Sequence, residues 1–369
     1  MANHTLGEKF RAILATGRVA NLPTVWSNVI MAFYLALTLS SIEEFEQKQA
    51  FTLWLVFFAS IATSCLYVGG CMLGDYRDIS FDRENRPNRP LVTGLLSPSS
   101  VAITAISLLT LGLLIGGLST VSALTITFGI PLSAILPSDI DDVVFLLQTD
   151  KLSLLALLVL FIITYALFHK RSRPFALANM ALCRTQLVIF AAALAIPIFQ
   201  SAEGYGFGTP TNSFQLLWHH YPILISAAAV GIYTLLLASV AATESNTDKI
   251  KFSSALKVSM FLLPVTVIGI LFFTEAAQLP LYGKVISENG IPVHVLRGYF
   301  IGTIVVYCGW MLHAFSSLPN DKPAFVSRAL AGFCLLDACF AATYSLTVPL
   351  ICLVCFGLSL LLQKIAPAT

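Results

Sequence analysis

Charged residues are scarce in this chain. Aspartate, glutamate, lysine and arginine make up only 11% of its 369 residues, whereas 57% are hydrophobic. A soluble domain of this length carries far more charge on its surface, so the composition excludes that class. Backbone groups inside a bilayer must be hydrogen-bonded internally, and the long apolar runs favour helices over a barrel. The chain is therefore predicted to be an all-α polytopic membrane protein.

Several common functional signals are also missing. The eight cysteines lie mostly inside apolar runs and show neither a metal-ligand spacing nor a disulfide framework. The sequence contains no Ser/His/Asp arrangement and no nucleotide-binding loop. A net charge of +2 gives no indication of nucleic-acid binding, and no nucleic-acid partner is expected. The polar residues that remain gather in a few clusters, and these carry the functional argument.

The apolar runs predict a single transmembrane domain over residues 1–369, with about nine or ten spanning helices. The last two runs are separated by only a few residues, so one kinked unit is an alternative there. No small-residue cleavage site follows the first run, which favours an uncleaved span over a signal peptide. The candidate spans are 19–41, 50–73, 99–118, 152–168, 175–199, 219–243, 256–274, 294–313, 327–344 and 346–363.

The stretch 119–150 is predicted to be a non-spanning insertion, although 119–136 is apolar enough to cross. If it crossed, the basic segment at 169–173 would lie opposite the basic loop that follows residue 77. Leaving it out places on one side all of the 21 lysines and arginines except Lys48, Lys151, Lys284 and Arg297. The positive-inside rule makes that side cytoplasmic. We expect a multi-pass protein of the cell (inner) membrane with its N-terminus in the cytoplasm.

The most informative stretch is 74–94, which reads GDYRDISFDRENRPNRPLVTG. Asp75, Asp78 and Asp82 are spaced by three and four residues, and on a helix these positions share one face. Stacked carboxylates need cations, and hard oxygen ligands suit Mg²⁺ together with substrate phosphate oxygens. Arginines can hold further phosphate oxygens, and the stretch supplies them at Arg77, Arg83, Arg86 and Arg89. The combination predicts a diphosphate site, whereas a solvated charged loop is the simpler alternative.

A second acidic cluster is predicted on the same side, in ATESNTDKIKFSS at 242–254. Glu244 and Asp248 are neighbours on a helix, and Lys249 and Lys251 follow them. An ordinary charged helix end is the alternative. Two facing acidic clusters can hold two Mg²⁺ ions with a diphosphate between them.

Other polar residues lie at the ends of spans or within them. Tyr165 precedes the basic pair His169 and Lys170, where simple anchoring at the membrane surface is the alternative. Asn28 and Arg184 fall inside spans, and such residues usually face the protein interior. They are candidate cavity residues, with helix–helix hydrogen bonding as the alternative.

The stretch 74–90 resembles the first aspartate-rich motif of the UbiA superfamily of intramembrane prenyltransferases, usually NDxxDxxxDxxNxRPxRP. Gly74 stands where that family has asparagine, and the rest matches through Arg89 and Pro90. The family's second motif is usually DxxxD, and this chain has ExxxD at 244–248. LPTVWSN, YALFHK, LCR and LLDA further resemble the EboC-like branch of the superfamily.

The resemblance implies a helical bundle around a central cavity and a transferase that uses Mg²⁺. The substrates would be an isoprenoid diphosphate and an aromatic or other lipophilic acceptor in the membrane. The implied metal ligands are Asp75, Asp78, Asp82, Glu244 and Asp248. The implied diphosphate ligands are Arg77, Arg83, Arg86, Arg89, Lys170, Lys249 and Lys251, and the cavity residues are Asn28, Tyr165 and Arg184.

Two alternatives use the same sequence differently. In the first, a catalytically reduced, EboC-type protein binds or helps export a natural-product precursor, as the missing asparagine and the thinner second motif suggest. The second is a secondary transporter, which would place its charges near mid-membrane. Here most charges gather at the cytoplasmic ends of the spans, which favours the enzyme.

Overall fold

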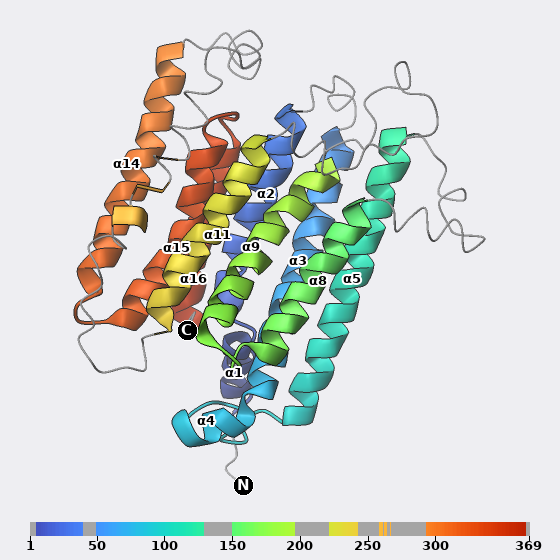
Figure 1. Ribbon diagram of the computed structural model, residues 1–369, viewed down its shortest axis with the longest axis vertical. Coiled ribbons are helices and arrows are strands. Elements are labelled where there is room, and N and C mark those ends of the chain that lie inside the picture. The colour runs from blue at the N-terminus through green and yellow to red at the C-terminus, as the bar shows by residue number, and fades with distance from the viewer. Residues whose placement is uncertain are drawn as a thin grey trace.

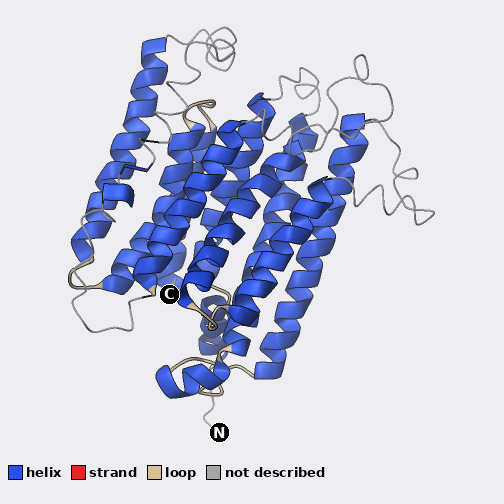
Figure 2. Ribbon diagram, in the orientation of Figure 1, coloured by secondary structure: helices blue, strands red, loops and turns tan. Residues whose placement is uncertain are grey.

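The computed structural model describes residues 5–39, 49–128, 150–195, 221–242 and 293–366, with a few more between 258 and 266. Within these ranges every regular element is a helix, as predicted, and no strand is present (Figure 2). Nine helices in the described part of the chain are long and apolar enough to cross a membrane. The helices are α1 (Leu6–Thr16), the 3-10 helix η1 (Val19–Asn21), α2 (Leu22–Leu39), α3 (Gln49–Arg77), α4 (Ile79–Asn85), α5 (Pro98–Phe128), α8 (Asp150–Phe168), α9 (Arg173–Ala195), α11 (Tyr221–Ala241), α14 (Val293–Ser317), α15 (Lys322–Ala341) and α16 (Val348–Ile365).

Helix α2 lies at the centre of the bundle, packed against α3, α9, α15 and α16 (Figure 1). The spans of α2 and α15 are 72% and 78% buried, whereas those of α5 and α14 are only 22% and 17% buried. The outer helices expose aliphatic side chains such as Ile103, Leu118 and Val305. This inside-out distribution is expected when lipid, rather than water, surrounds the bundle. Polar residues on α2 are therefore enclosed by protein.

Helices α3 and α5 approach each other closely because glycines line their contact. A Cβ added at Gly112 would lie 2.8 Å from the Ala62 carbonyl oxygen, and one added at Gly69 would lie 3.0 Å from the Ala105 carbonyl oxygen. Small residues at such contacts are typical of helix pairs in membranes, where close van der Waals packing replaces the hydrophobic effect. The pair holds the C-terminal end of α3, and with it the first aspartate motif, in a fixed place.

Two boundaries differ from the sequence-based expectation. Helix α5 was predicted to end at residue 118, but it continues without a break to Phe128. The last two spans are separate helices, α15 and α16, that pack against each other, so the alternative of one kinked unit is wrong. The remainder of the predicted insertion, 129–149, and most of the predicted span 256–274 lie outside the described residues.

The elements that carry the first motif meet at one end of the bundle. Helix α4 and the lower ends of α3, α5 and α8 lie there beside α1 (Figure 1). The chain returns to this end at the close of α8, where His169 and Lys170 contact Asp78. The two segments at 74–94 and 169–173 are thus at the same end, as the charge distribution predicted.

Candidate functional site

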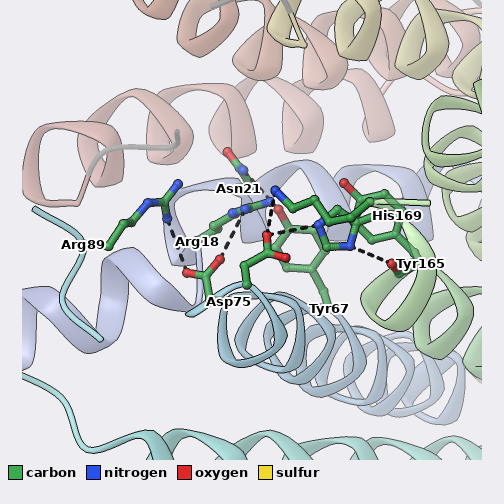
Figure 3. Close-up of polar contacts among 9 residues, drawn as sticks. Arg18, Asn21, Tyr67, Asp75, Arg89, Tyr165 and His169 are labelled. Carbon is green, nitrogen blue, oxygen red and sulfur yellow. Dashed lines mark hydrogen bonds and ion pairs between the residues drawn. The ribbon is translucent and has the colours of Figure 1, made fainter. Parts of the chain in front are cut away.

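Asp75 lies in the last turn of α3 and is only 8% exposed. Each of its carboxylate oxygens faces a different guanidinium: Arg18 lies 3.6 Å from Oδ1 and Arg89 lies 3.4 Å from Oδ2 (Figure 3). Arg18 connects α1 to η1 with a φ of 47°, in the left-handed region that non-glycine residues seldom adopt. This turn places the Arg18 guanidinium beside the Asp75 carboxylate at the end of α3.

Asp78 falls at the break between α3 and α4 rather than on a continuous helix. Although Asp75 faces Arg18 and Arg89, Asp78 faces the end of α8. Its Oδ2 lies 3.1 Å from His169 Nε2 and 3.3 Å from Lys170 Nζ. Burial raises the pKa of Asp78, but the hydrogen bond from His169 and the charges of His169 and Lys170 outweigh it, so the net pKa is lowered.

His169 is itself held by Tyr165, one helical turn earlier. Its Nδ1 lies 3.0 Å from the Tyr165 carbonyl oxygen, and the two rings stack at 5.1 Å between centroids. The ring of His169 thus lies between the Tyr165 carbonyl and the Asp78 carboxylate, and these two contacts fix its orientation.

Asp82 lies on α4 and is 5% exposed, and its Oδ1 has no hydrogen-bond partner among the residues that the structure describes. The arginines of this region divide in two groups. Arg89 contacts Asp75, whereas Arg77, Arg83 and Arg86 are exposed to solvent and have no ion pair among the described residues. Lys170 combines its contact to Asp78 with a position 3.7 Å from the centroid of the Phe81 ring.

Deeper in the bundle, a second polar network joins α2, α9 and α15. Arg184 donates to Asn28 Oδ1 and to Thr24 Oγ1, both at 2.9 Å. Asn28 Nδ2 in turn donates to both oxygens of Asp337, at 2.8 and 2.9 Å, and Ser27 also donates to Asp337. Of the predicted cavity residues, Asn28 and Arg184 are thus brought together here.

Tyr67 and Asn21 lie between the two clusters. Tyr67 is eight residues before Asp75, so both fall on one face of α3. Its hydroxyl accepts a hydrogen bond of 3.0 Å from Asn21 Nδ2, and its ring lies 5.6 Å from the Arg184 guanidinium carbon. Figure 3 shows Tyr67, Asn21 and Arg18 gathered beside Asp75. A chain of polar groups therefore leads from the end of the bundle into its interior.

Sequence reasoning did not assign Arg18, Tyr67 or Asp337 to the site. For Tyr67 the signal was present as the spacing of eight from Asp75. For Asp337 the signal was an acid inside an apolar run, whose partner cannot be named from sequence. Arg18 depends on a turn that brings α1 under the bundle, and sequence carries no local sign of that contact.

The second acidic motif lies outside the described residues, and with it Glu244, Asp248, Lys249 and Lys251. Within the described ranges, no group of three histidine, cysteine, aspartate or glutamate side chains is arranged to hold a metal ion. The oxygen ligands that Mg²⁺ prefers are nevertheless present at this end of the bundle. Two buried oxygens, the carboxylate Oδ1 of Asp82 and the amide Oδ1 of Asn21, accept no hydrogen bond from the described residues. An added Cβ at Gly74 would meet nothing within 4 Å, so this position is open.

Comparison with known proteins gave two matches, one to a solved structure and one to a family. A search of solved structures found one described as giving structural and mechanistic insights into digeranylgeranylglyceryl phosphate synthase in membranes. It shares 13% sequence identity with this chain and covers 91% of it and 98% of its own length, with a TM-score of 0.45. A search of curated proteins found no match. Over residues 21–137, which run from η1 through α5 and include Asp75, Asp78, Asp82 and Arg89, the chain is similar to the UbiA prenyltransferase family.

Proposed function

We propose that this protein is an intramembrane prenyltransferase. It transfers the prenyl group of an isoprenoid diphosphate to a lipophilic acceptor, such as an aromatic compound, and uses Mg²⁺. The observation that carries the proposal is the cluster of buried acids and cations at one end of the bundle, within the segment similar to the UbiA prenyltransferase family. A membrane-embedded bundle with such an end suits a substrate that has a charged head and a long apolar tail.

The cations of the cluster are proposed to bind the diphosphate. Arg18 and Arg89 approach Asp75 from two sides, and His169 and Lys170 approach Asp78. Guanidinium groups bind phosphate oxygens through paired N–H donors, and lysine acts as a compact charge. Because these side chains are already held in place by the aspartates, little conformational entropy is lost when the diphosphate binds.

The acids are proposed to hold Mg²⁺: Asp75, Asp78 and Asp82, with Glu244 and Asp248 from the second motif. When bound, Mg²⁺ neutralises the negative charge that the diphosphate develops as it leaves. The exposed Arg77, Arg83 and Arg86 are assigned to the approach of the substrate, together with Lys249 and Lys251 of the second motif. The surrounding helices exclude water, which would otherwise capture the allylic cation.

A second candidate keeps the fold without turnover: an EboC-type protein that binds or helps export a natural-product precursor. Two observations favour it. Position 74 is glycine, where the family pattern has asparagine. Asp75 and Asp78 are each already paired with two cations. Mg²⁺-dependent release of diphosphate from the purified protein, stimulated by substrate, separates the enzyme from this alternative.

The substitution Asp78→Asn tests the diphosphate site. It keeps the size of the side chain but removes one negative charge from the proposed metal ligands. We expect Mg²⁺-dependent equilibrium binding of a fluorescent prenyl diphosphate to weaken at least tenfold, or about 1.4 kcal/mol.

Asp321→Asn is the matched control, because Asp321 caps α15 by accepting from the Ala324 N–H, and asparagine caps equally well. This control should bind like the parent. Parental affinity in Asp78→Asn, with a clear Mg²⁺ effect in the parent, would remove Asp78 from the site. A parent without Mg²⁺-dependent binding would favour the non-catalytic candidate.

A further inference from the structure

Arg184 is a buried cation in the middle of the span formed by α9. It lies eleven residues from Arg173 at the start of that helix, or about 16 Å along the axis. Its guanidinium contacts two neutral oxygens, Thr24 Oγ1 and Asn28 Oδ1, and lies 5.0 Å from the centroid of the Phe333 ring. No carboxylate in the described part of the chain is within ion-pair distance of it.

Such a charge is costly in the interior of a membrane protein. Neutral hydrogen-bond acceptors and aromatic faces offset part of the desolvation, but a direct counterion offsets much more. Intramembrane ionisable residues mark functional sites by default. The described contacts of Arg184 therefore offset only part of the cost of burying its charge.

Asp337 is the nearest acid of the network, but it is engaged elsewhere. The Asn28 amide separates the two charges, because its oxygen accepts from Arg184 and its nitrogen donates to Asp337. Ser27 supplies a further donor to the same carboxylate. Asp337 thus fixes the orientation of Asn28, and Asn28 fixes Arg184. Asp337 acts as a positioning residue rather than as the direct counterion.

The guanidinium also has unused donors. It carries five N–H groups, and its described hydrogen bonds use two of them. Arg184 is 8% exposed, whereas Thr24, Asn28 and Asp337 are fully buried at 0%. Among these four residues, Arg184 alone therefore keeps any accessible surface. Tyr67 and Asn21 connect this position to the acidic end of the bundle.

We propose that Arg184 binds the anionic group of the acceptor, a carboxylate or a phosphate, inside the bundle. The assignment of Arg184 rests on the proposed function, because it gives each of the two substrates of a prenyltransferase a separate site. The cations around Asp75 and Asp78 hold the diphosphate, and Arg184 holds the oxyanion of the second substrate. If the network only held α2, α9 and α15 together, the protein would not bind anionic lipids in preference to neutral ones.

The test uses the purified full-length chain and three probes with the same alkyl chain. These are dodecyl phosphate, dodecanoate and the neutral methyl dodecanoate, with the bound fraction measured by native mass spectrometry at matched concentrations. We expect at least a tenfold preference for one or both oxyanions over the ester, and the two anions distinguish a phosphate site from a carboxylate site. Arg184→Gln should remove that preference. Arg328→Gln, which removes an exposed guanidinium from α15, should keep it.

Arg184→Gln removes one end of the chain of hydrogen bonds that runs from Arg184 through Asn28 to Asp337, so a second variant protects the test against misfolding. The double substitution Arg184→Gln with Asp337→Asn removes both buried charges together, which is far better tolerated than removing one. It should also lose the preference for anions. A parent without the preference, or a folded Arg184 variant that keeps it, would overturn the proposal. Prenyl diphosphate binding is measured separately, so its failure would count against the proposed function alone.

Discussion

At the scale of single residues, three aspartates in one motif occupy three different environments. Asp75 is buried between two arginines, and Asp78 is paired with His169 and Lys170. Asp82 has an oxygen without a partner in the described part of the chain. The cause is that different segments pack against each acid: Arg18 and Arg89 face Asp75, and the end of α8 faces Asp78. Spacing alone would have given all three the same surroundings.

The pairing of Asp78 predicts a dependence of stability on pH. Because its pKa is lowered in the folded protein, the pair contributes stability above the ordinary aspartate value of about 3.9, and this contribution is lost as pH falls through the folded pKa. The difference in thermal unfolding temperature between the parent and Asp78→Asn should be constant from about pH 6 to pH 5 and should shrink below about pH 4. A difference already absent at pH 6 would contradict the pairing.

At the scale of helices, the contact of α3 with α5 depends on missing side chains. Gly69 and Gly112 sit where a Cβ would press against a backbone carbonyl of the other helix. Since α3 carries Tyr67 and Asp75, a shift at this contact would reach the site directly. Gly117, one and a half turns further along α5, has nothing within 4 Å of an added Cβ.

These two glycines of α5 give a matched pair of substitutions. Gly112→Ala should destabilise the protein by about 1–3 kcal/mol, because the added methyl group overpacks a tight contact. Gly117→Ala should be neutral or should stabilise by up to about 1 kcal/mol, since alanine favours the helix. Thermal unfolding of both variants in the same detergent measures the difference. Equal effects would show that the α3–α5 contact can relax.

The sequence was sufficient for the helical class, for most spans and for the acids of the first motif, because apolar length and aspartate spacing are local signals. The partners of Asp78 could not be predicted, since they come from the end of α8 and reach it only through packing. Arg18 and Asp337 reach their partners only through packing between segments far apart in the chain. The roles of Glu244 and Asp248 stay predictions.

At the scale of the whole molecule, the basic segments gather at one end of the bundle. The contact of His169 and Lys170 with Asp78 joins the end of α8 to the loop after α3. That the chain between α5 and α8 adds no crossing stays a prediction.

Accessibility mapping tests this sidedness in a membrane. Single cysteines introduced at Arg86 and Arg171 in a variant lacking the native cysteines should both react with an impermeant thiol reagent from the cytoplasmic side only. Both positions are exposed in the structure. A cysteine at Leu118 on the lipid-facing side of α5 is the control and should react from neither side. Labelling of positions 86 and 171 from opposite sides would contradict the arrangement.

The link between Asn28 and Asp337 spans 309 positions in the chain, and this has a consequence for biogenesis. At about 5–20 residues per second, the ribosome needs roughly 15–60 s to make the partner of Asn28 after Asn28 itself has been made. Arg184 is made about halfway through that interval, and from then on the polar side chains of α2 have Arg184 but not the acid that orients them. The central helix α2 therefore enters the membrane before all the hydrogen-bond partners of its buried side chains have been made. Final assembly must wait for α15, almost the last helix to be synthesised.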